Sequence, residues 1–267
     1  SLLIFRGGTE PSGLAGWKRF TRLVSTMLGR NAPLILVGVL SYRRPDYLQQ
    51  TLEAFLARNA TLLDGTIQLI GLDQAATEST RQVFDQFRES FEAVYFTPEN
   101  HGIGWGYSQL VRCAANHGAE FYLHLEDDWL CRESLADYLS PLLELFRQSD
   151  VGTIRLRTIA DPIDGMNHVT QEPLTFVDWD ANFEVGDFHY VFNPHLVRLK
   201  VSQKLIPCVS EHDAQIRYHK LGLRAARLKA HVFEHGGHRR AAGRISRRES
   251  SPALLSLDEL REQVPRF

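Results

Sequence analysis

Between residues 34 and 125, short apolar segments alternate with longer mixed segments, and this alternation restricts the chain to few folds. The apolar segments have the length of strands, and they occupy residues 34–40, 66–72, 91–96 and 120–125. We expect helices between them, at residues 46–58, 77–91 and 103–117. Strands that alternate with helices pair in parallel through right-handed crossovers. The sequence therefore predicts an α/β fold with a mostly parallel, doubly wound central sheet.

The chain is less regular beyond residue 130. We expect strands at residues 151–158, 188–193 and 227–233, a helix at residues 210–221, and an irregular stretch at residues 159–185. An amphipathic helix is expected at residues 14–28. It could lie on a membrane surface, although packing on the domain itself is the favoured interpretation.

Bulk properties exclude several classes of protein. The 267 residues carry a net charge of −2, so no global field favours nucleic acid. Cys113, Cys131 and Cys208 are odd in number and widely spaced, which argues against a disulfide framework and for a reducing, cytoplasmic location. No apolar run approaches the roughly 20 residues that a membrane-spanning helix needs.

An acidic triplet, Glu126-Asp127-Asp128, directly follows the strand predicted at residues 120–125. In doubly wound sheets, ligands bind beyond the carboxyl ends of strands. Three adjacent carboxylates are costly without compensation, and a divalent cation would supply it. The alternative is that the acids precede a helix near residue 133, where negative charge is also favoured. The position at a strand end favours a metal site.

Residues 34–240 resemble the GT-A fold of nucleotide-sugar glycosyltransferases, especially the inverting family 2. The Glu-Asp-Asp triplet resembles the variant DXD motif of the N-acetylglucosaminyltransferase I group. The resemblance implies that Asp128 binds Mn²⁺ or Mg²⁺, which bridges the donor diphosphate, and that Glu126 and Asp127 contact the ribose and the donor sugar. A divalent cation would neutralise the charge that develops on the leaving nucleoside diphosphate.

Three further strand ends match the same family pattern. The turn that contains Ser41 and Arg43 resembles the one that holds the nucleobase, although Arg43 stands where the family commonly has Asn. Asp73 matches an acid that accepts a hydrogen bond from uracil. Asn100 and Gly102 resemble a turn whose glycine allows the backbone to approach the donor closely.

Two carboxylates are candidates for the general base. Glu211 occupies the base position of the family pattern, counted back from Gly222, and Asp213 is the second choice. Ser210 replaces the acid that usually precedes the base. The reaction requires a carboxylate beside the acceptor hydroxyl. A serine N-cap followed by acids in the first helical turn would give the same pattern.

Histidines are dense between residues 231 and 238. The resemblance implies a late histidine as a further metal ligand, and we assign His235, with His238 second. His231, Glu234 and His235 also spell an inverted zincin motif, which would indicate a zinc hydrolase. That motif needs a helix, whereas in a strand His231 and His235 would lie about 13 Å apart.

These observations predict a metal-dependent enzyme that transfers a hexose or N-acetylhexosamine from a UDP-sugar to a hydroxyl acceptor, with inversion. The acceptor could be a glycan, a lipid or a small molecule, and Trp179 could either stack on it or pack in the core. The alternative is a GT-A-like protein that binds UDP and metal without catalysis. We divide the chain into an N-terminal arm and helix (1–33), a nucleotide-sugar-binding half (34–130), an acceptor and catalytic half of the same domain (131–240), and a C-terminal tail (241–267).

Overall fold

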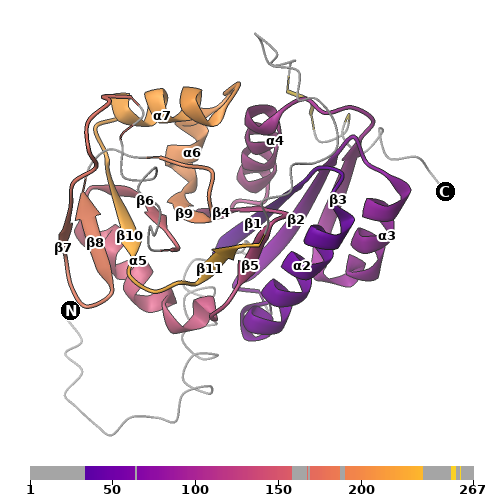
Figure 1. Cartoon of the computed structure of the whole chain (residues 1–267), viewed down its shortest axis with the longest axis horizontal. Coiled ribbons are helices and arrows are strands. Elements are labelled where there is room, and N and C mark those ends of the chain that lie inside the picture. The colour runs from indigo at the N-terminus through magenta and orange to yellow at the C-terminus, as the bar shows by residue number, and fades with distance from the viewer. Residues whose placement is uncertain are drawn as a thin grey trace, which may run out of the picture.

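The computed structural model of the protein has a central sheet with helices on both faces (Figure 1). It describes residues 34–63, 65–157, 167, 169–186, 190–236, 254–256 and 259. The helix predicted at residues 14–28, His238 and most of the C-terminal tail lie outside these residues. The nine-stranded sheet has the order β3-β2-β1-β4-β9-β6-β10-β8-β7, and β11 and β5 form a separate pair. Within the part described, no helix is long and apolar enough to cross a bilayer.

The first half of the sheet is parallel, as predicted. It consists of β1 (Ile35–Ser41), β2 (Ile67–Gln74), β3 (Phe91–Thr97) and β4 (Phe121–Glu126). The connections contain α2 (Pro45–Asn59), α3 (Glu78–Gln86) and α4 (Ile103–Asn116), with 3₁₀ turns η1 (Ala60–Leu62) and η2 (Arg88–Ser90). Strand β1 pairs with both β2 and β4, so the carboxyl ends of these three strands lie side by side.

The second half of the sheet is mixed. It consists of β6 (Val151–Arg155), β7 (Phe176–Asp178), β8 (Phe183–Gly186), β9 (His195–Arg198) and β10 (Arg224–Leu228). Strand β9 joins the two halves, because it pairs antiparallel with both β4 and β6. The helical elements are η3 (Leu135–Asp137), α5 (Leu139–Gln148), α6 (Leu199–Leu205) and α7 (Glu211–Lys220). The short pair consists of β5 (Trp129–Cys131) and β11 (Phe233–His235).

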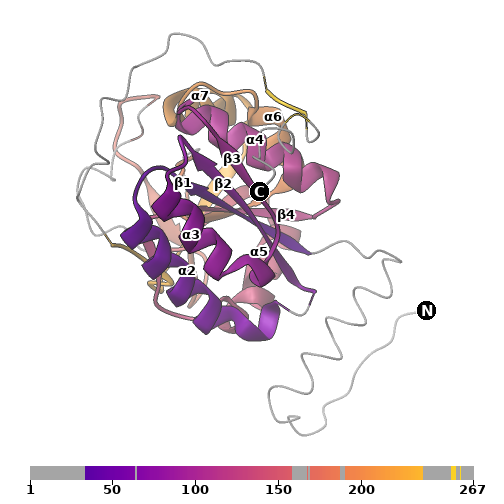
Figure 2. The ribbon, with the colours of Figure 1, turned by 90° about the vertical axis from the view of Figure 1, so that its right-hand side faces the viewer.

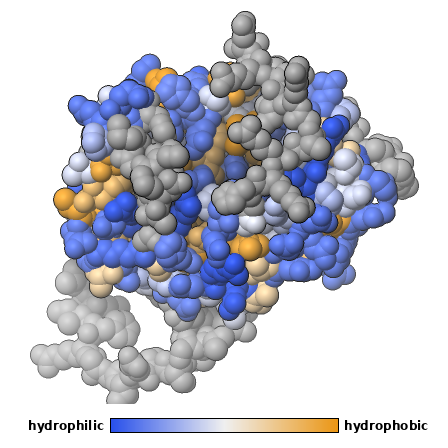
Figure 3. All heavy atoms as spheres, viewed as in Figure 1, coloured by the Kyte–Doolittle hydropathy of each residue, from blue (hydrophilic) through white to orange (hydrophobic). Residues whose placement is uncertain are grey.

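Two apolar cores lie on opposite faces of the sheet. Helices α2, α3 and α5 pack on one face, and α4, α6 and α7 pack on the other (Figure 2). Where Figure 3 shows described residues, the surface is mainly hydrophilic, with apolar side chains in small separate areas. The burial of apolar area on both faces stabilises the sheet and fixes the strand ends that carry the triplet.

Several predicted boundaries were wrong. Residues 190–193 belong to no strand; Tyr190 and Phe192 are buried against the α4 side, and the strand of this region is β9. Their apolar pattern therefore reflects core packing and not strand pairing. Helix α3 ends at Gln86, where a 3₁₀ turn follows. The single strand expected at residues 227–233 is two strands, β10 and β11, in different sheets.

Candidate active site

The acidic triplet forms the turn between β4 and β5, and its backbone is fixed to neighbouring elements. The Asp127 amide donates to the Leu40 carbonyl at the end of β1 (3.1 Å), and Thr51 Oγ1 of α2 donates to the Asp127 carbonyl (2.9 Å). Asp127 and Asp128 are only 1% and 6% exposed. The turn therefore holds two carboxylates almost out of solvent, at the edge where β1, β2 and β4 end.

Arg44 compensates the negative charge of the last two acids of the triplet, Asp127 and Asp128. Its Nη1 donates to Asp128 Oδ2 (2.6 Å), its Nε donates to Asp127 Oδ2 (3.3 Å), and its Nη2 pairs with Asp127 Oδ1. Part of the charge compensation that we expected from a divalent cation therefore comes from Arg44. Sequence reasoning missed Arg44, although its place beside Pro45, after the end of the strand next to β4, was the available signal.

Burial shifts the titration of the triplet. It raises the pKa of Asp127 to about 7, although Arg44 and the Tyr42 amide, which donates to Oδ2 (3.0 Å), both lower it. Burial and then the charge of Asp128 raise the pKa of Glu126 to about 8, against the lowering effect of Arg44. Raised carboxylate pKa values of this kind cluster at functional sites, where ligands supply the missing compensation.

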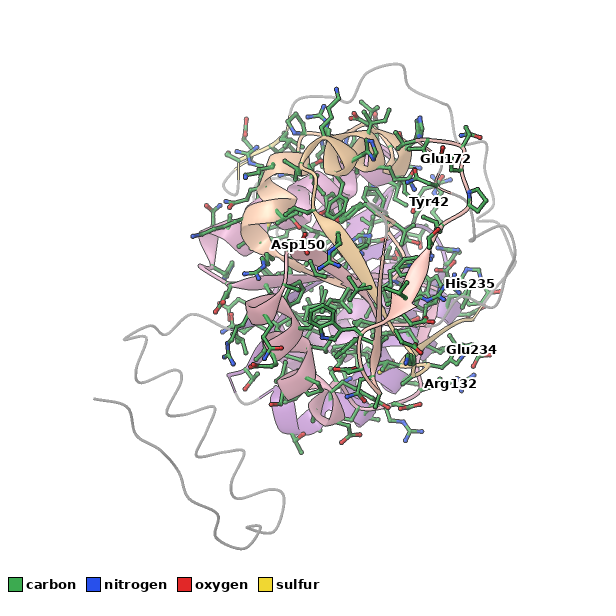
Figure 4. The ribbon with its side chains drawn as sticks, turned by 90° about the vertical axis from the view of Figure 1, so that its left-hand side faces the viewer. Tyr42, Arg132, Asp150, Glu172, Glu234 and His235 are labelled. Carbon is green, nitrogen blue, oxygen red and sulfur yellow. The ribbon has the colours of Figure 1, made fainter. Side chains whose placement is uncertain are left out.

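His235 reaches the triplet through the β5–β11 pair. His235 lies opposite Trp129, with ring centroids 4.9 Å apart, and its Nε2 is 3.3 Å from Asp128 Oδ2. Figure 4 places His235 and Tyr42 toward the same side of the molecule, and each contacts an acid of the triplet. Asp128 Oδ1 is buried and has no hydrogen-bond partner in the part of the chain described.

A divalent cation fits this arrangement chemically. The unsatisfied Asp128 Oδ1 and a nearby imidazole are ligands that Mn²⁺ accepts. No group of three or more His, Cys, Asp or Glu side chains able to hold a metal occurs among the described residues. A complete coordination shell would therefore need the donor phosphates or further ligands.

Asp73 holds the turn that follows β1 through its hydrogen bond with Ser41. It lies beside Ser41 in the β1–β2 register, accepts from Ser41 Oγ (3.0 Å) and Thr80 Oγ1 (2.5 Å), and is 0% exposed. Burial raises its pKa to about 6. Arg43 is exposed at a positive φ of 54°, and its Nε approaches the Ala75 carbonyl at 3.5 Å. Asp73 thus holds the Ser41 end of the turn, whereas Arg43 is exposed to solvent.

The turn at residues 100–102 lies at the N-terminus of α4. Asn100 Oδ1 accepts from the Gly102 amide (2.8 Å), and Gln74 bonds both the His101 amide (2.8 Å) and the Gly102 carbonyl (3.1 Å). Gly102 has a φ of 92°, which favours glycine. The side-chain bonds therefore hold the turn rigidly against the end of β2.

The two base candidates differ in their contacts. Asp213 belongs to the cap of α7: it accepts from the Val209 amide (3.1 Å) and pairs with Arg217 (3.1 Å), while its own amide donates to Ser210 Oγ (3.2 Å). Glu211 Oε1 instead accepts from the Phe192 amide (2.8 Å). A Cβ on Gly104 would lie 2.5 Å from the Ser210 nitrogen, so α4 packs directly against the turn that carries Glu211.

The inverted zincin motif is not formed. Phe233–His235 is a strand, so the helix that would bring His231 and His235 onto one face is missing there. Glu234 pairs with Arg132 (2.5 Å), and both are exposed (Figure 4). This geometry gives no support to a zinc hydrolase.

No protein-family model and no curated protein sequence matches the chain. Solved structures do match it, and they identify the architecture as the GT-A type of α/β fold. S. aureus TarS residues 1–349 match with a TM-score of 0.53 at 14% identity, covering 74% of this chain and 59% of that one. The same protein in complex with UDP-GlcNAc matches with a TM-score of 0.53 at 13% identity, covering 79% and 62%. Its complex with UDP gives 0.52 at 16% identity, covering 74% and 59%. The chain thus spans about three fifths of the length of these neighbours.

Proposed function

We propose that the protein is a glycosyltransferase that uses a UDP-sugar as donor and a hydroxyl group as acceptor. One observation carries this proposal: an acidic triplet with two buried carboxylates lies at the carboxyl end of β4 in a GT-A sheet, between the β1 turn and a histidine of β11. Neighbouring structures hold UDP and UDP-GlcNAc, which supports this donor class. A panel of UDP-sugars would decide whether the transferred sugar is a hexose or an N-acetylhexosamine.

The donor lies along the edge where β1, β2 and β4 end. The turn of Ser41 and Arg43 and the turn of Asn100 and Gly102 form its walls, and Glu126 faces the ribose and the donor sugar. Asp127 is 1% exposed and bonds Arg44 and the Tyr42 amide through its two oxygens, so we assign it to holding the turn. Asp73 is fully buried, so we assign it to holding Ser41 in place and not to a direct contact with the base.

Asp128 and His235 would hold Mn²⁺ or Mg²⁺, and His238 is a further candidate ligand. When bound, the ion would neutralise negative charge on the leaving diphosphate. Arg44 already occupies Asp128 Oδ2, which leaves Oδ1 to face the ion. Arg44 also lowers the pKa of Asp127, at a site where burial raises it.

Glu211 accepts the proton of the acceptor hydroxyl. As that oxygen bonds to the anomeric carbon from the face opposite the diphosphate, the bond between the anomeric carbon and the diphosphate breaks, which inverts the configuration. The Phe192 amide orients the Glu211 carboxylate, whereas Asp213 is committed to the helix cap. We therefore prefer Glu211 as the base.

Calorimetry with UDP, with and without Mn²⁺, tests the donor site. We expect Mn²⁺ to strengthen UDP binding at least tenfold in the wild-type chain and to have little effect in Asp128→Asn. UDP binding that is independent of both would refute the metal-assisted site. A donor panel then separates the two functions: binding without any transfer or hydrolysis would identify a non-catalytic UDP-binding protein.

A further inference from the structure

Two buried polar atoms lie close together where β4 ends, one on the first acid of the triplet and one on a histidine of the same strand. Glu126 Oε1 and His124 Nε2 are 3.7 Å apart, and neither has a hydrogen-bond partner among the residues that the structure describes. His124 is 0% exposed. Buried polar atoms are nearly always satisfied. The separation exceeds an N–H···O bond by only about 0.5–1 Å, so a small rotation of Glu126 would satisfy both atoms.

The other ring nitrogen of His124 is fixed by a phenol. Tyr122 Oη lies 2.9 Å from His124 Nδ1. Room for this phenol comes from Gly38, which pairs with His124 in the β1–β4 register: a Cβ at that position would lie 2.5 Å from Tyr122 Oη. Because Gly38 has no side chain, the Tyr122 phenol has room to reach the His124 imidazole.

Burial keeps both groups in their neutral forms. Burial lowers the pKa of His124 to about 3, so the imidazole is neutral and carries one proton. Burial raises the pKa of Tyr122 well above its ordinary value, so the phenol keeps its proton. When the phenol donates to Nδ1, the ring proton lies on Nε2 and points at the Glu126 carboxylate.

A second buried histidine provides the contrast. His195 lies directly opposite His124 in the β4–β9 register and is also 0% exposed. Its Nε2 bonds Tyr190 Oη (2.8 Å), and its Nδ1 bonds the Asn193 carbonyl (2.7 Å). Both nitrogens of His195 are therefore satisfied inside the core, whereas His124 directs one nitrogen toward the candidate site.

We propose that His124 is a positioning residue: its Nε2–H donates to Glu126 Oε1 and orients that carboxylate toward the hydroxyl groups of the donor. The hydrogen bond is a property of the chain itself. Its role in donor binding rests on the proposed function.

Nitrogen-15 NMR of the histidine side chains tests the hydrogen bond without any nucleotide. We expect the His124 proton on Nε2, with an Nε2–H resonance that shifts in Glu126→Gln, because the carboxyl oxygen that accepts this proton is replaced by an amide group. A proton on Nδ1, or an Nε2–H resonance that Glu126→Gln leaves in place, would overturn the proposal.

Calorimetry with UDP-GlcNAc tests the role in donor binding. In His124→Asn, the amide can bond Tyr122 but cannot reach Glu126, and we expect about tenfold weaker binding. His124→Gln restores a donor near the Nε2 position, so we expect its affinity within about twofold of wild type. The matched control His195→Gln removes an equally buried imidazole, and we expect it to retain wild-type affinity.

Equal losses in all three variants would show a packing effect only and would overturn the positioning role. If the wild-type chain binds no UDP-sugar at all, the proposed function fails and the donor role fails with it. The NMR result decides the His124–Glu126 hydrogen bond in either case, so the two failures are distinguishable.

Discussion

Arg44 and Asp128 form an ion pair in which Nη1 lies 2.6 Å from Oδ2, while the other carboxylate oxygen of Asp128 has no hydrogen-bond partner in the described part of the chain. The Arg44 side chain is 20% exposed, so the pair is largely shielded from water. Breaking a buried pair by removing one partner is costly, because the other charge remains buried.

We therefore expect Arg44→Gln to lower the free energy of unfolding by about 2–4 kcal/mol. Added Mn²⁺ should recover part of this loss, because it supplies the missing charge. Arg43→Gln is the matched control: Arg43 is exposed, and its replacement should change stability by less than about 0.5 kcal/mol. Urea unfolding with and without Mn²⁺ measures both effects, and equal stabilities for the two variants would contradict the role of Arg44.

Substitutions of Glu211 and Asp213 should have different effects, the first on turnover and the second on the cap of α7. Glu211→Gln should keep the affinity for UDP and lower kcat at least a hundredfold, because it removes the carboxylate that we propose as acceptor of the hydroxyl proton. Asp213→Asn should instead destabilise the cap of α7 by about 1 kcal/mol and retain most activity. Steady-state kinetics and thermal unfolding distinguish the variants. Wild-type turnover in Glu211→Gln would remove this residue from the mechanism.

Asp73 should make stability depend on pH in a defined window. Its pKa is raised from 3.8 to about 6 in the folded chain, so the folded state binds the proton more tightly than the unfolded state. The sign follows: stability is greatest below the unfolded pKa and falls as the pH rises through the folded pKa. The expected loss is about 2–3 kcal/mol.

Asp73→Asn removes this titration while keeping the shape of the side chain. The difference in unfolding free energy between wild type and Asp73→Asn should therefore change steadily between pH 4 and pH 6.5. A difference that stays constant over that range would show that Asp73 titrates normally.

The three cysteines should be unreactive in the folded protein. Cys113, Cys131 and Cys208 are all buried. Burial also raises the pKa of Cys131 and of Cys208 to about 11, so few thiolates exist at neutral pH. A chromogenic disulfide reagent should label no thiol in buffer and all three in denaturant. Rapid labelling in buffer would contradict the packing described for these residues.

The sequence predicted the parallel half of the fold because its signals are local. Each strand from β1 to β4 is a short apolar segment that ends in polar residues, and each connection has a helical length. The mixed half is set by long-range contacts. Residues 190–193 have the composition of a strand, yet Tyr190 and Phe192 fill the core without pairing, and β9 begins only at His195.

In the candidate site, too, residues with local sequence signals were predicted, and residues defined by long-range contacts were not. The triplet was found from its position after an apolar strand, and the family resemblance suggested its partner His235. Arg44 was missed because its role depends on the distance between the ends of β1 and β4 and on its own side-chain conformation. His124 was not singled out because only the three-dimensional contact with Glu126 distinguishes it from a core histidine such as His195.

The pairing of β11 with β5 sets when the site can assemble during synthesis. Asp128 and His235 are 107 residues apart, so the carboxylate leaves the ribosome long before the imidazole that lies beside it. Synthesis begins at the N-terminus, and a domain generally folds as a unit, so the segments of the parallel strands are available before the domain is complete. Until residue 235 is available, the chain carries the acids and Arg44 but lacks the histidine. A nascent or truncated chain that stops before β11 would thus hold the complete acidic turn and still be unable to assemble the whole site.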